Sequence, residues 1–356
     1  MMEVTINNKK FLVDEIYQPV FGHKDIPSKR SDSYRRLETI IEAERAFNQN
    51  KLLEKEQNIL DFGCNNGFFL FELSKLMKQE SNLYGIDSKE EYLNIAKEVK
   101  SEFNLNNIFF HQSDNLDFGK DIKIDTYILL SVLHHINPSV IIRDDIKNKL
   151  NEASTIYIEP AHHCEYPDWS RNLIPKNPEE HPYFFWKTNL ESQFPEFTVR
   201  LIDVNRTHLG SFRPMFLLKK KINKSFVYNE TSYNIYDEFN APFIWHPDNT
   251  RKYYFAESNN QKYFIKIRNN GEVKIKPYTD SLLLMEIVRL GLLPWYNRKK
   301  IKTQLEKIKN LKHPDKELWN IFVDENSDLV LIDPDDKSMM TDEQMNAHIQ
   351  SMIYMI

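Results

Sequence analysis

The stretch Asn58-Ile-Leu-Asp-Phe-Gly-Cys-Asn-Asn-Gly-Phe-Phe69 decides the fold class of this chain. It opens on a short, largely apolar run that predicts a buried strand, and apolar residues at helical spacing begin at Phe68. Gly63 and Gly67 bracket the turn between them, where the lack of a Cβ lets a ligand approach the backbone. A strand, a glycine turn and a helix in this order predict the opening unit of a doubly wound α/β sheet, which binds ligands at the carboxyl ends of its strands.

Two common nucleotide-binding loops do not fit this turn. Asn65 stands where the dinucleotide motif G-x-G-x-x-G needs glycine, and the Gly-Lys-Ser/Thr of a P-loop is absent. The form Asp-x-Gly-x-x-x-Gly, from Asp61 to Gly67, resembles motif I of the class I S-adenosylmethionine-dependent methyltransferases. An ordinary tight turn between a strand and a helix is the alternative, and the elements that follow decide between the two.

Four more strands are predicted at the spacing of repeated β-α-β units, over residues 83–87, 108–114, 125–133 and 155–159. The first ends in Asp87, whose carboxylate can accept both ribose hydroxyls of a nucleoside, and Ser88 is predicted to cap the next helix. The resemblance implies that Asp114 binds the adenine amino group, and residues 131–136, S-V-L-H-H-I, also match a methyltransferase pattern. The predicted fold is therefore α/β, a doubly wound class I methyltransferase with a Rossmann-like seven-stranded sheet.

A closer resemblance extends over roughly residues 10–220. The motifs E-I-Y-Q-P-V-F-G-H (15–23), R-L-E-T-I (36–40), L-D-F-G-C-N-N-G-F-F (60–69) and R-P-M-F-L (213–217) resemble the methyltransferase half of the bacterial O-antigen polymannose chain-terminating methyltransferase/kinase family. Those enzymes phosphorylate the terminal sugar of a glycan and methylate that phosphate. The resemblance implies an acceptor oxygen on a sugar or sugar phosphate, in surface glycan synthesis. A small-molecule or tRNA methyltransferase and a non-catalytic cofactor-binding scaffold are the alternatives.

The predicted site gathers residues from the strand ends and from the segment before the first strand. The resemblance implies that Tyr17 and Arg36 line the pocket, with Arg36 facing the carboxylate of the cofactor's methionine; a packed aromatic and a surface charge are the alternatives. The full set predicted to hold S-adenosylmethionine is Tyr17, Arg36, Asp61, Gly63, Asn65, Gly67, Asp87, Ser88, Asp114, Asn115 and Ser131.

His134, His135 and Glu159 are predicted to face the methyl acceptor. A histidine can serve as general base for a hydroxyl because imidazole titrates near neutrality, whereas a phosphate acceptor needs only a group that positions an anion. For His135, a hydrogen bond that caps the next helix is the alternative. His162, His163 and Glu165 follow nearby, but no pair has the helical spacing of a zinc motif and adjacent histidines tend to point apart, so no metal is predicted in this domain.

Length and composition indicate a packed protein of two domains. The 356 residues are 41% hydrophobic and 28% charged, and we place a methyltransferase domain at 1–222 and a reduced protein-kinase-like domain at 223–356. The net charge of −5 argues against a general nucleic-acid partner. Cys64 and Cys164 lack metal-ligand spacing and indicate free thiols in a reducing compartment. No signal peptide or membrane span is recognised, so we expect a cytoplasmic protein that associates peripherally with glycan-assembly proteins.

The second part of the chain resembles a protein kinase in one region. Residues 251–257 and 261–267 predict a hairpin, residues 280–290 and 299–311 predict helices, and H-P-D-K-E-L-W-N at 313–320 resembles the kinase catalytic loop. The resemblance implies that Asp315 orients the acceptor hydroxyl and that Asn320 and Asp333 hold Mg²⁺. It further implies that Lys266 pairs with the phosphates of ATP and that Glu286 is its helix partner.

This second resemblance is incomplete. No glycine-rich loop precedes Lys266, its distance to residue 313 is short for a nucleotide-binding lobe, and D-P-D stands at 333–335 in place of D-F-G. Three interpretations remain open: a minimal active sugar kinase that uses ATP and Mg²⁺, a degenerate kinase that serves as a binding or assembly module, and chance similarity in an unrelated α+β appendage.

Overall fold

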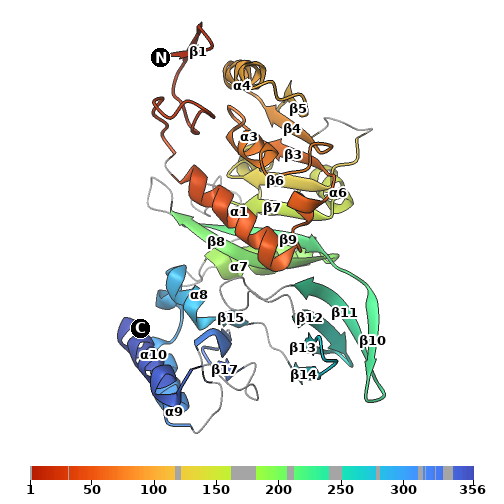
Figure 1. Ribbon diagram of the computed structural model, residues 1–356, viewed down its shortest axis with the longest axis vertical. Helices are drawn as coiled ribbons and strands as arrows, with labels where there is room; N and C mark the ends of the chain where they lie inside the picture. The colour runs from red at the N-terminus through yellow and green to blue at the C-terminus, as the bar shows by residue number, and fades with distance from the viewer. Residues whose placement is uncertain are drawn as a thin grey trace. The chain divides into compact units, whose positions relative to one another are not determined.

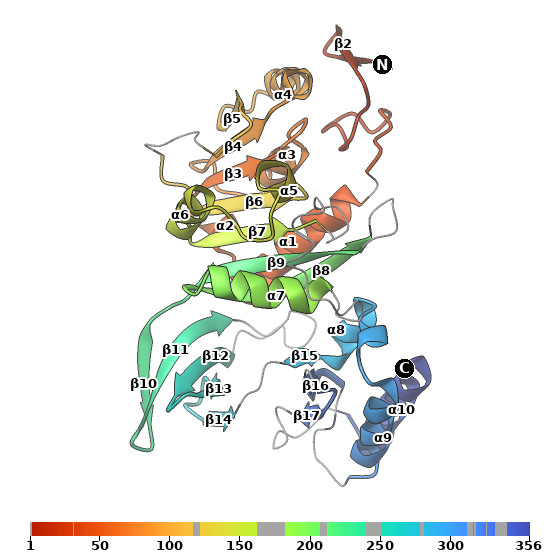
Figure 2. The same cartoon turned by 180° about the vertical axis from the view of Figure 1, so that it is seen from behind.

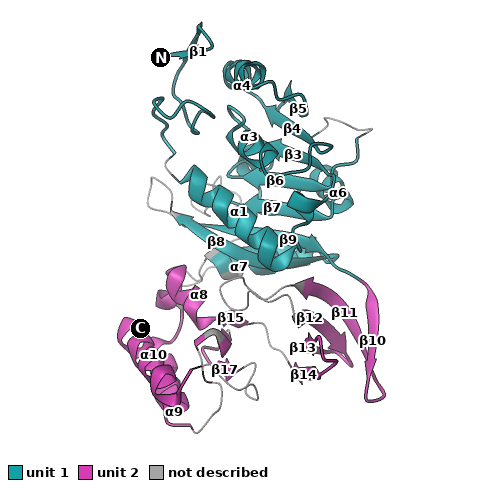
Figure 3. Cartoon of the chain, in the orientation of Figure 1, with its two compact units in different colours: residues 1–222 teal, residues 223–356 magenta. Residues whose placement is uncertain are grey.

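A computed structural model of the chain describes residues 2–30, 32–116, 122–161, 182–206, 212–239, 251–277, 281–311, 316, 318–324, 326–331 and 340–356. The chain divides into two compact units, residues 1–222 and 223–356 (Figure 3).

A seven-stranded sheet forms the centre of the first unit, in the order β5-β4-β3-β6-β7-β9-β8. The first strand of this sheet, β3, lies at its centre. β4 and β5 follow on one side of β3, and the later strands lie on the other side, so the switch point of this doubly wound sheet lies between β3 and β6. The last two strands pair antiparallel, which is the class I methyltransferase arrangement and confirms the predicted fold class. The parallel strands are β3 (Asn58–Phe62), β4 (Asn82–Asp87), β5 (Ile108–Gln112), β6 (Thr126–Leu130) and β7 (Thr155–Glu159), and the closing hairpin is β8 (Phe197–Arg206) with β9 (Phe212–Lys220).

Helices cover both faces of this sheet. Figures 1 and 2 view opposite sides, with α1 (Ser33–Phe47) in front in the first and α7 (Pro182–Gln193) in front in the second. A short hairpin of β1 (Met2–Ile6) and β2 (Lys9–Val13) packs on α4. The remaining helices of this unit are α2 (Lys51–Glu54), α3 (Phe68–Ser74), α4 (Glu90–Glu102), α5 (Leu133–Ile136) and α6 (Asp144–Glu152).

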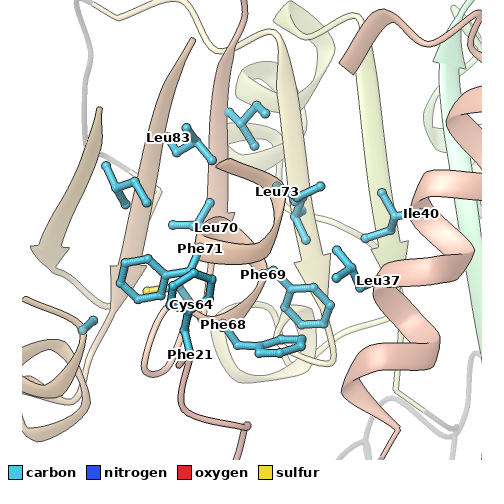
Figure 4. Close-up of a cluster of buried hydrophobic side chains, with 14 of the residues drawn as sticks. Phe21, Leu37, Ile40, Cys64, Phe68, Phe69, Leu70, Phe71, Leu73 and Leu83 are labelled. Carbon is cyan, nitrogen blue, oxygen red and sulfur yellow. The ribbon is translucent and has the colours of Figure 1, made fainter. Parts of the chain in front are cut away.

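One apolar cluster fixes the start of α3 and therefore the glycine turn. Phe68 and Leu73 of α3 are fully buried, as is Ile40 of α1. Figure 4 shows these side chains meeting in one cluster with Phe21 and Cys64. Complete burial of one large apolar side chain contributes about 1.5–3 kcal/mol to the stability of the fold. The glycine turn is therefore held between a well-packed strand, β3, and a well-packed helix, α3.

Three sequence-based boundaries were wrong. The strand predicted at 125–133 ends at Leu130, because Ser131 takes a left-handed backbone with φ 59° and the short helix α5 starts two residues later. The strand predicted to reach Asp114 ends at Gln112. Ser88 does not cap α4, since Lys89 occupies the N-cap position.

The packing around Gly67 leaves no room for a Cβ. Its φ is +81°, and a Cβ there would lie 2.8 Å from the ring of Phe110 and 2.9 Å from the ring of Phe71. We expect Gly67→Ala to lower the free energy of unfolding by about 3 kcal/mol, the upper end for a strained residue, measured by scanning calorimetry. Gly271→Ala is the matched control, because Gly271 has φ +84° but open space around it, and it should cost only about 1 kcal/mol. Equal losses in the two variants would contradict the packing argument.

The second unit contains two antiparallel sheets and three α-helices in its described residues. The larger sheet comprises β10 (Lys224–Tyr228), β11 (Thr231–Phe239), β12 (Arg251–Ser258), β13 (Gln261–Arg268) and β14 (Val273–Pro277), and its β12-β13 hairpin was predicted. The smaller comprises β15 (Ser281–Leu283), β16 (Ile321–Asp324) and β17 (Leu329–Leu331), accompanied by α8 (Leu284–Arg289), α9 (Arg298–Lys309), α10 (Asp342–Met355) and the 3₁₀ turns Leu293–Trp295 and Leu318–Asn320. The helix predicted at 280–290 was therefore partly wrong, because residues 281–283 pair with β16.

None of the helices in the described residues has the length and apolar character needed to cross a membrane.

Candidate active site

The glycine turn is tied to the neighbouring strand by Asp87. The backbone N–H of Asn65 donates to Asp87 Oδ2 at 2.8 Å, and the N–H of Lys89 donates to Oδ1 at 2.9 Å. The N–H groups of Gly63 and Cys64 both donate to the carbonyl of Ile86, at 2.8 and 3.0 Å. Because each carboxylate oxygen can accept more than one hydrogen bond, Asp87 is fixed in place and still able to accept hydroxyl groups.

Asp61 lies beneath this turn with an unused oxygen. Its side chain is 3% exposed, and no described residue donates a hydrogen bond to its Oδ2. Burial, with a further contribution from the Asp87 carboxylate, raises the pKa of Asp61 to about 8. A buried acceptor without a donor is uncommon in folded proteins and indicates a ligand or water in contact with it.

Three more buried acceptors lie at or beside the turn. The Oδ1 atoms of Asn65 and Asn66 and the Oε1 of Gln18 have no hydrogen-bond partner within the described ranges. The Nδ2 of Asn66 donates to the carbonyl of Gln18 at 2.9 Å, which joins the N-terminal segment to the turn. The turn therefore presents several acceptors that suit a ligand rich in hydrogen-bond donors.

A buried ion-pair cluster occupies the carboxyl ends of β6 and β7. Glu159, the last residue of β7, is completely buried, and its Oε1 accepts hydrogen bonds from Arg36 Nη2 and Ser131 Oγ. Its Oε2 accepts from Asn205 Nδ2 at 2.6 Å. Arg30 Nη2 lies 3.7 Å from Oε1, so two arginines face this carboxylate.

Arg36 keeps one guanidinium nitrogen available for a ligand. Its Nε forms an ion pair with Asp32 Oδ2 at 3.3 Å, whereas its Nη1 has no hydrogen-bond partner in the described part of the chain. The residue is 1% exposed, so the alternative of a surface charge was wrong. Burial lowers the pKa of Arg36, while Glu159 opposes that shift. The remaining Nη1 donor suits an anionic group of a ligand.

The two histidines follow the cluster on α5. His134 is half-buried and His135 is exposed. Their ring centroids are 4.0 Å apart at an interplanar angle of 38°, so the expectation that they point apart was wrong. His162, His163, Glu165 and Cys164 lie outside the described residues, and Cys64 is a buried free thiol. Among the described residues, no group of three or more metal-ligating side chains is present.

The other predicted cofactor residues are more peripheral. Tyr17 accepts a hydrogen bond from Arg30 Nη1 at 2.7 Å, which joins it to the ion-pair cluster. Ser88, Asp114 and Asn115 are exposed and follow the ends of β4 and β5.

Sequence reasoning missed three polar residues of the cluster. Arg30 and Asp32 form an ion pair, with Arg30 Nε 2.9 Å from Asp32 Oδ1, just before α1. Asn205 is 1% exposed on β8. Polar side chains in the otherwise apolar strand at 197–206 were a usable signal, because a buried polar group on a strand needs a partner.

The kinase-like residues of the second unit are only partly described. Lys266 is 2% exposed on β13, where its Cα pairs with those of Tyr253 and Lys274. Glu286 on α8 forms an ion pair with Arg289 at 2.6 Å. Asn320 ends the second 3₁₀ turn, and the predicted Asp315 and Asp333 lie outside the described residues.

The chain is similar to several known methyltransferases. Residues 53–193 match the family model of a methyltransferase domain. The O-antigen chain terminator bifunctional methyltransferase/kinase WbdD of Escherichia coli is 26% identical over 276 residues, 70% of this chain and 34% of that protein. The tRNA U34 carboxymethyltransferase of Campylobacter fetus subsp. fetus (strain 82-40) is 28% identical over 144 residues, 38% of this chain and 50% of that protein. A medium-resolution structure of WbdD is similar with a TM-score of 0.46 and 21% identity, covering 95% of this chain and 85% of that one.

The chain spans about a third of the length of the WbdD proteins it matches. The strand order, the glycine turn with its acidic partners and the matching domain model agree on one assignment. Residues 53–193 therefore form a methyltransferase domain, and the sheet around it has the fold of the class I S-adenosylmethionine-dependent methyltransferases.

Proposed function

We propose that the chain transfers a methyl group from S-adenosylmethionine to an oxygen atom of a sugar or sugar phosphate during the synthesis of a bacterial surface glycan. The observation that carries the cofactor part is the pair of complementary unused groups at one edge of the sheet. Asp61 offers a buried acceptor, and the buried Arg36 offers its Nη1 as a donor. The ammonium and carboxylate of a methionine moiety have the opposite hydrogen-bonding character, so the residues fit this cofactor.

Each group would hold a different part of the cofactor. Asp87 would accept the ribose hydroxyls, Asp114 would accept from the adenine amino group, and Arg36 would bind the carboxylate. When bound, S-adenosylmethionine would supply a methyl group on a sulfonium: the acceptor oxygen would bond to the methyl carbon as the carbon–sulfur bond breaks, and the sulfur would leave as a neutral thioether. The protein would contribute mainly by aligning that oxygen with the methyl, since correct orientation accounts for much of the rate enhancement in such reactions.

The acceptor part rests on the relatives and on the residues near the histidines. WbdD is named as an O-antigen chain terminator, and its match extends over 70% of this chain, more than the methyltransferase domain alone. If the acceptor is a hydroxyl, His134 or His135 would remove its proton. If the acceptor is a phosphate oxygen, no general base is needed to remove a proton from it. The histidines and Arg30 would then position the phosphate anion.

The second unit gives this proposal two versions. In one, Lys266, Asn320 and the predicted Asp315 and Asp333 bind ATP and Mg²⁺, and the chain phosphorylates the glycan end before methylating it. In the other, the unit binds the glycan or another assembly protein without phosphorylation. We propose the cytoplasm as the location, in keeping with the free thiol of Cys64.

Calorimetric titration with S-adenosylmethionine tests the cofactor part. We expect one site per chain, and titration with ATP and Mg²⁺ in a separate experiment then decides between the two versions. Transfer of a labelled methyl group to mannose-terminated glycans, with and without a terminal phosphate, tests the acceptor. The absence of any binding of S-adenosylmethionine would refute the proposal.

A tRNA acceptor is the second candidate, because one relative is a tRNA carboxymethyltransferase. The net charge of −5 counts against it, since tRNA binding depends on neutralising phosphate charge. Labelled methyl transfer to total tRNA in the same assay distinguishes the two acceptors.

A further inference from the structure

Glu159 joins three separate elements of the first unit. It ends β7, Arg36 comes from α1, Ser131 follows β6 and Asn205 lies on β8. All four residues are buried or half-buried, and both carboxylate oxygens accept hydrogen bonds. Charge-assisted hydrogen bonds of this kind fix the orientation of both partners.

This arrangement is unsuited to a general base. A general base must lie within hydrogen-bond distance of the proton that it removes. The lone pairs of Glu159 are instead occupied by an arginine, a hydroxyl and an amide. The predicted catalytic role in contact with the acceptor therefore does not fit its surroundings.

We infer that Glu159 is a positioning residue, which holds Arg36 by Nη2 so that the remaining donor, Nη1, meets the carboxylate of the cofactor. Ser131 shares this task, because its Oγ lies 3.1 Å from Arg36 Nη2 and donates to Glu159. Asn205 fixes the second oxygen of Glu159 and so prevents the carboxylate from rotating. The inference rests on the proposed function, since it assumes that S-adenosylmethionine is the ligand.

Two effects of removing Glu159 oppose each other. Loss of its negative charge alone would strengthen the attraction between Arg36 and a ligand carboxylate. Loss of its oxygens would let Arg36 turn toward Asp32, which already lies 3.3 Å from Nε. Glu159→Gln removes the charge and retains an acceptor oxygen, whereas Glu159→Ala removes both, so the pair of variants separates the two effects.

The experiment measures affinity for S-adenosylmethionine and for its decarboxylated analogue, which lacks only the carboxylate. In Glu159→Ala we expect affinity for S-adenosylmethionine to fall at least about tenfold, the value of one charge-assisted hydrogen bond, and affinity for the analogue to change less than about threefold. Glu159→Gln should retain the preference of the unaltered chain for the carboxylate. Asn205→Ala keeps every charge and should also lower the preference for S-adenosylmethionine over the analogue. This variant tests the inference if Glu159→Ala fails to fold.

Glu44→Ala is the matched control for a merely structural effect. Glu44 is also a completely buried carboxylate between α1 and β7, but it accepts from Tyr157 Oη, from Asn48 Nδ2 at 2.8 Å and from the N–H of Leu52 at 3.0 Å. This variant should lose stability and keep its preference between the two ligands. The inference would be overturned if both Glu159→Ala and Asn205→Ala kept or increased the preference for S-adenosylmethionine. That result would leave the proposed function intact. Failure of the unaltered chain to bind either ligand would overturn the proposed function together with the inference.

Discussion

The affinity of this chain for S-adenosylmethionine is expected to rise about 20-fold between pH 6 and pH 7.5, because Asp61 must lose its proton to receive the positively charged cofactor. In the ligand-free chain its pKa is raised to about 8, so the carboxyl is mostly protonated throughout this range. A cation beside the unused Oδ2 favours the ionised form, which couples binding to proton release.

Calorimetry in buffers of different ionisation enthalpy measures this coupling directly. At pH 7 we expect the release of about one proton per cofactor bound. The range stops at pH 7.5 because an α-amino group itself titrates at about 7.7–8.0. Asp61→Asn is the control, since it cannot titrate and should bind with an affinity that is nearly independent of pH. A slope that persists in this variant would assign the effect to a group other than Asp61.

The stability of the ligand-free chain should follow the opposite trend. The pKa of Asp61 is raised from an ordinary value of 3.8 to about 8, so the folded chain binds this proton more tightly than the unfolded chain does. The stabilisation that this provides is complete below about pH 4 and is lost as the pH rises toward about 8. Ionisation of Asp61 thus lowers the stability of the ligand-free chain near neutrality and raises its affinity for the cofactor.

The sequence was sufficient for the fold because its signals were local and repeated. The β7 strand has the bounds predicted for it, 155–159, since short apolar runs between turns have few other solutions. The end of β6 was not predictable in this way, because Ser131 leaves the strand through a left-handed backbone that apolar periodicity does not reveal.

The site was harder because its partners are distant in the sequence. Asp61 and Asp87 were identified from motif spacing alone. The contact of Arg36 with Glu159 joins residues 123 positions apart, and that of Glu159 with Asn205 joins residues 46 positions apart. Only the sheet order brings these side chains together, so the role of Glu159 could not be inferred before the fold was known.

Asp87→Ala should lower the affinity for S-adenosylmethionine by about 100-fold or more, the largest loss expected for any single substitution in this site. Two charge-assisted hydrogen bonds to ribose hydroxyls contribute about 1.5–3 kcal/mol each, and both would be lost. The substitution also removes the acceptor of the Asn65 and Lys89 N–H groups, which loosens the glycine turn. Glu90→Ala is the matched control, because Glu90 is an exposed acid at the start of α4, and the affinity should then be almost unchanged.

Asp87→Ala should also have a second, specific effect, on the titration of Asp61, which a general loss of structure would not explain. The Asp87 carboxylate is one of the two causes that raise the pKa of Asp61, after burial. Its removal should therefore shift the midpoint of the Asp61 titration to lower pH, which carbon-detected NMR of the labelled carboxyl group can follow. An affinity within threefold of the unaltered chain would show that the ribose is held elsewhere. A weaker affinity with an unmoved Asp61 titration would instead indicate that the Asp87 carboxylate does not influence the ionisation of Asp61.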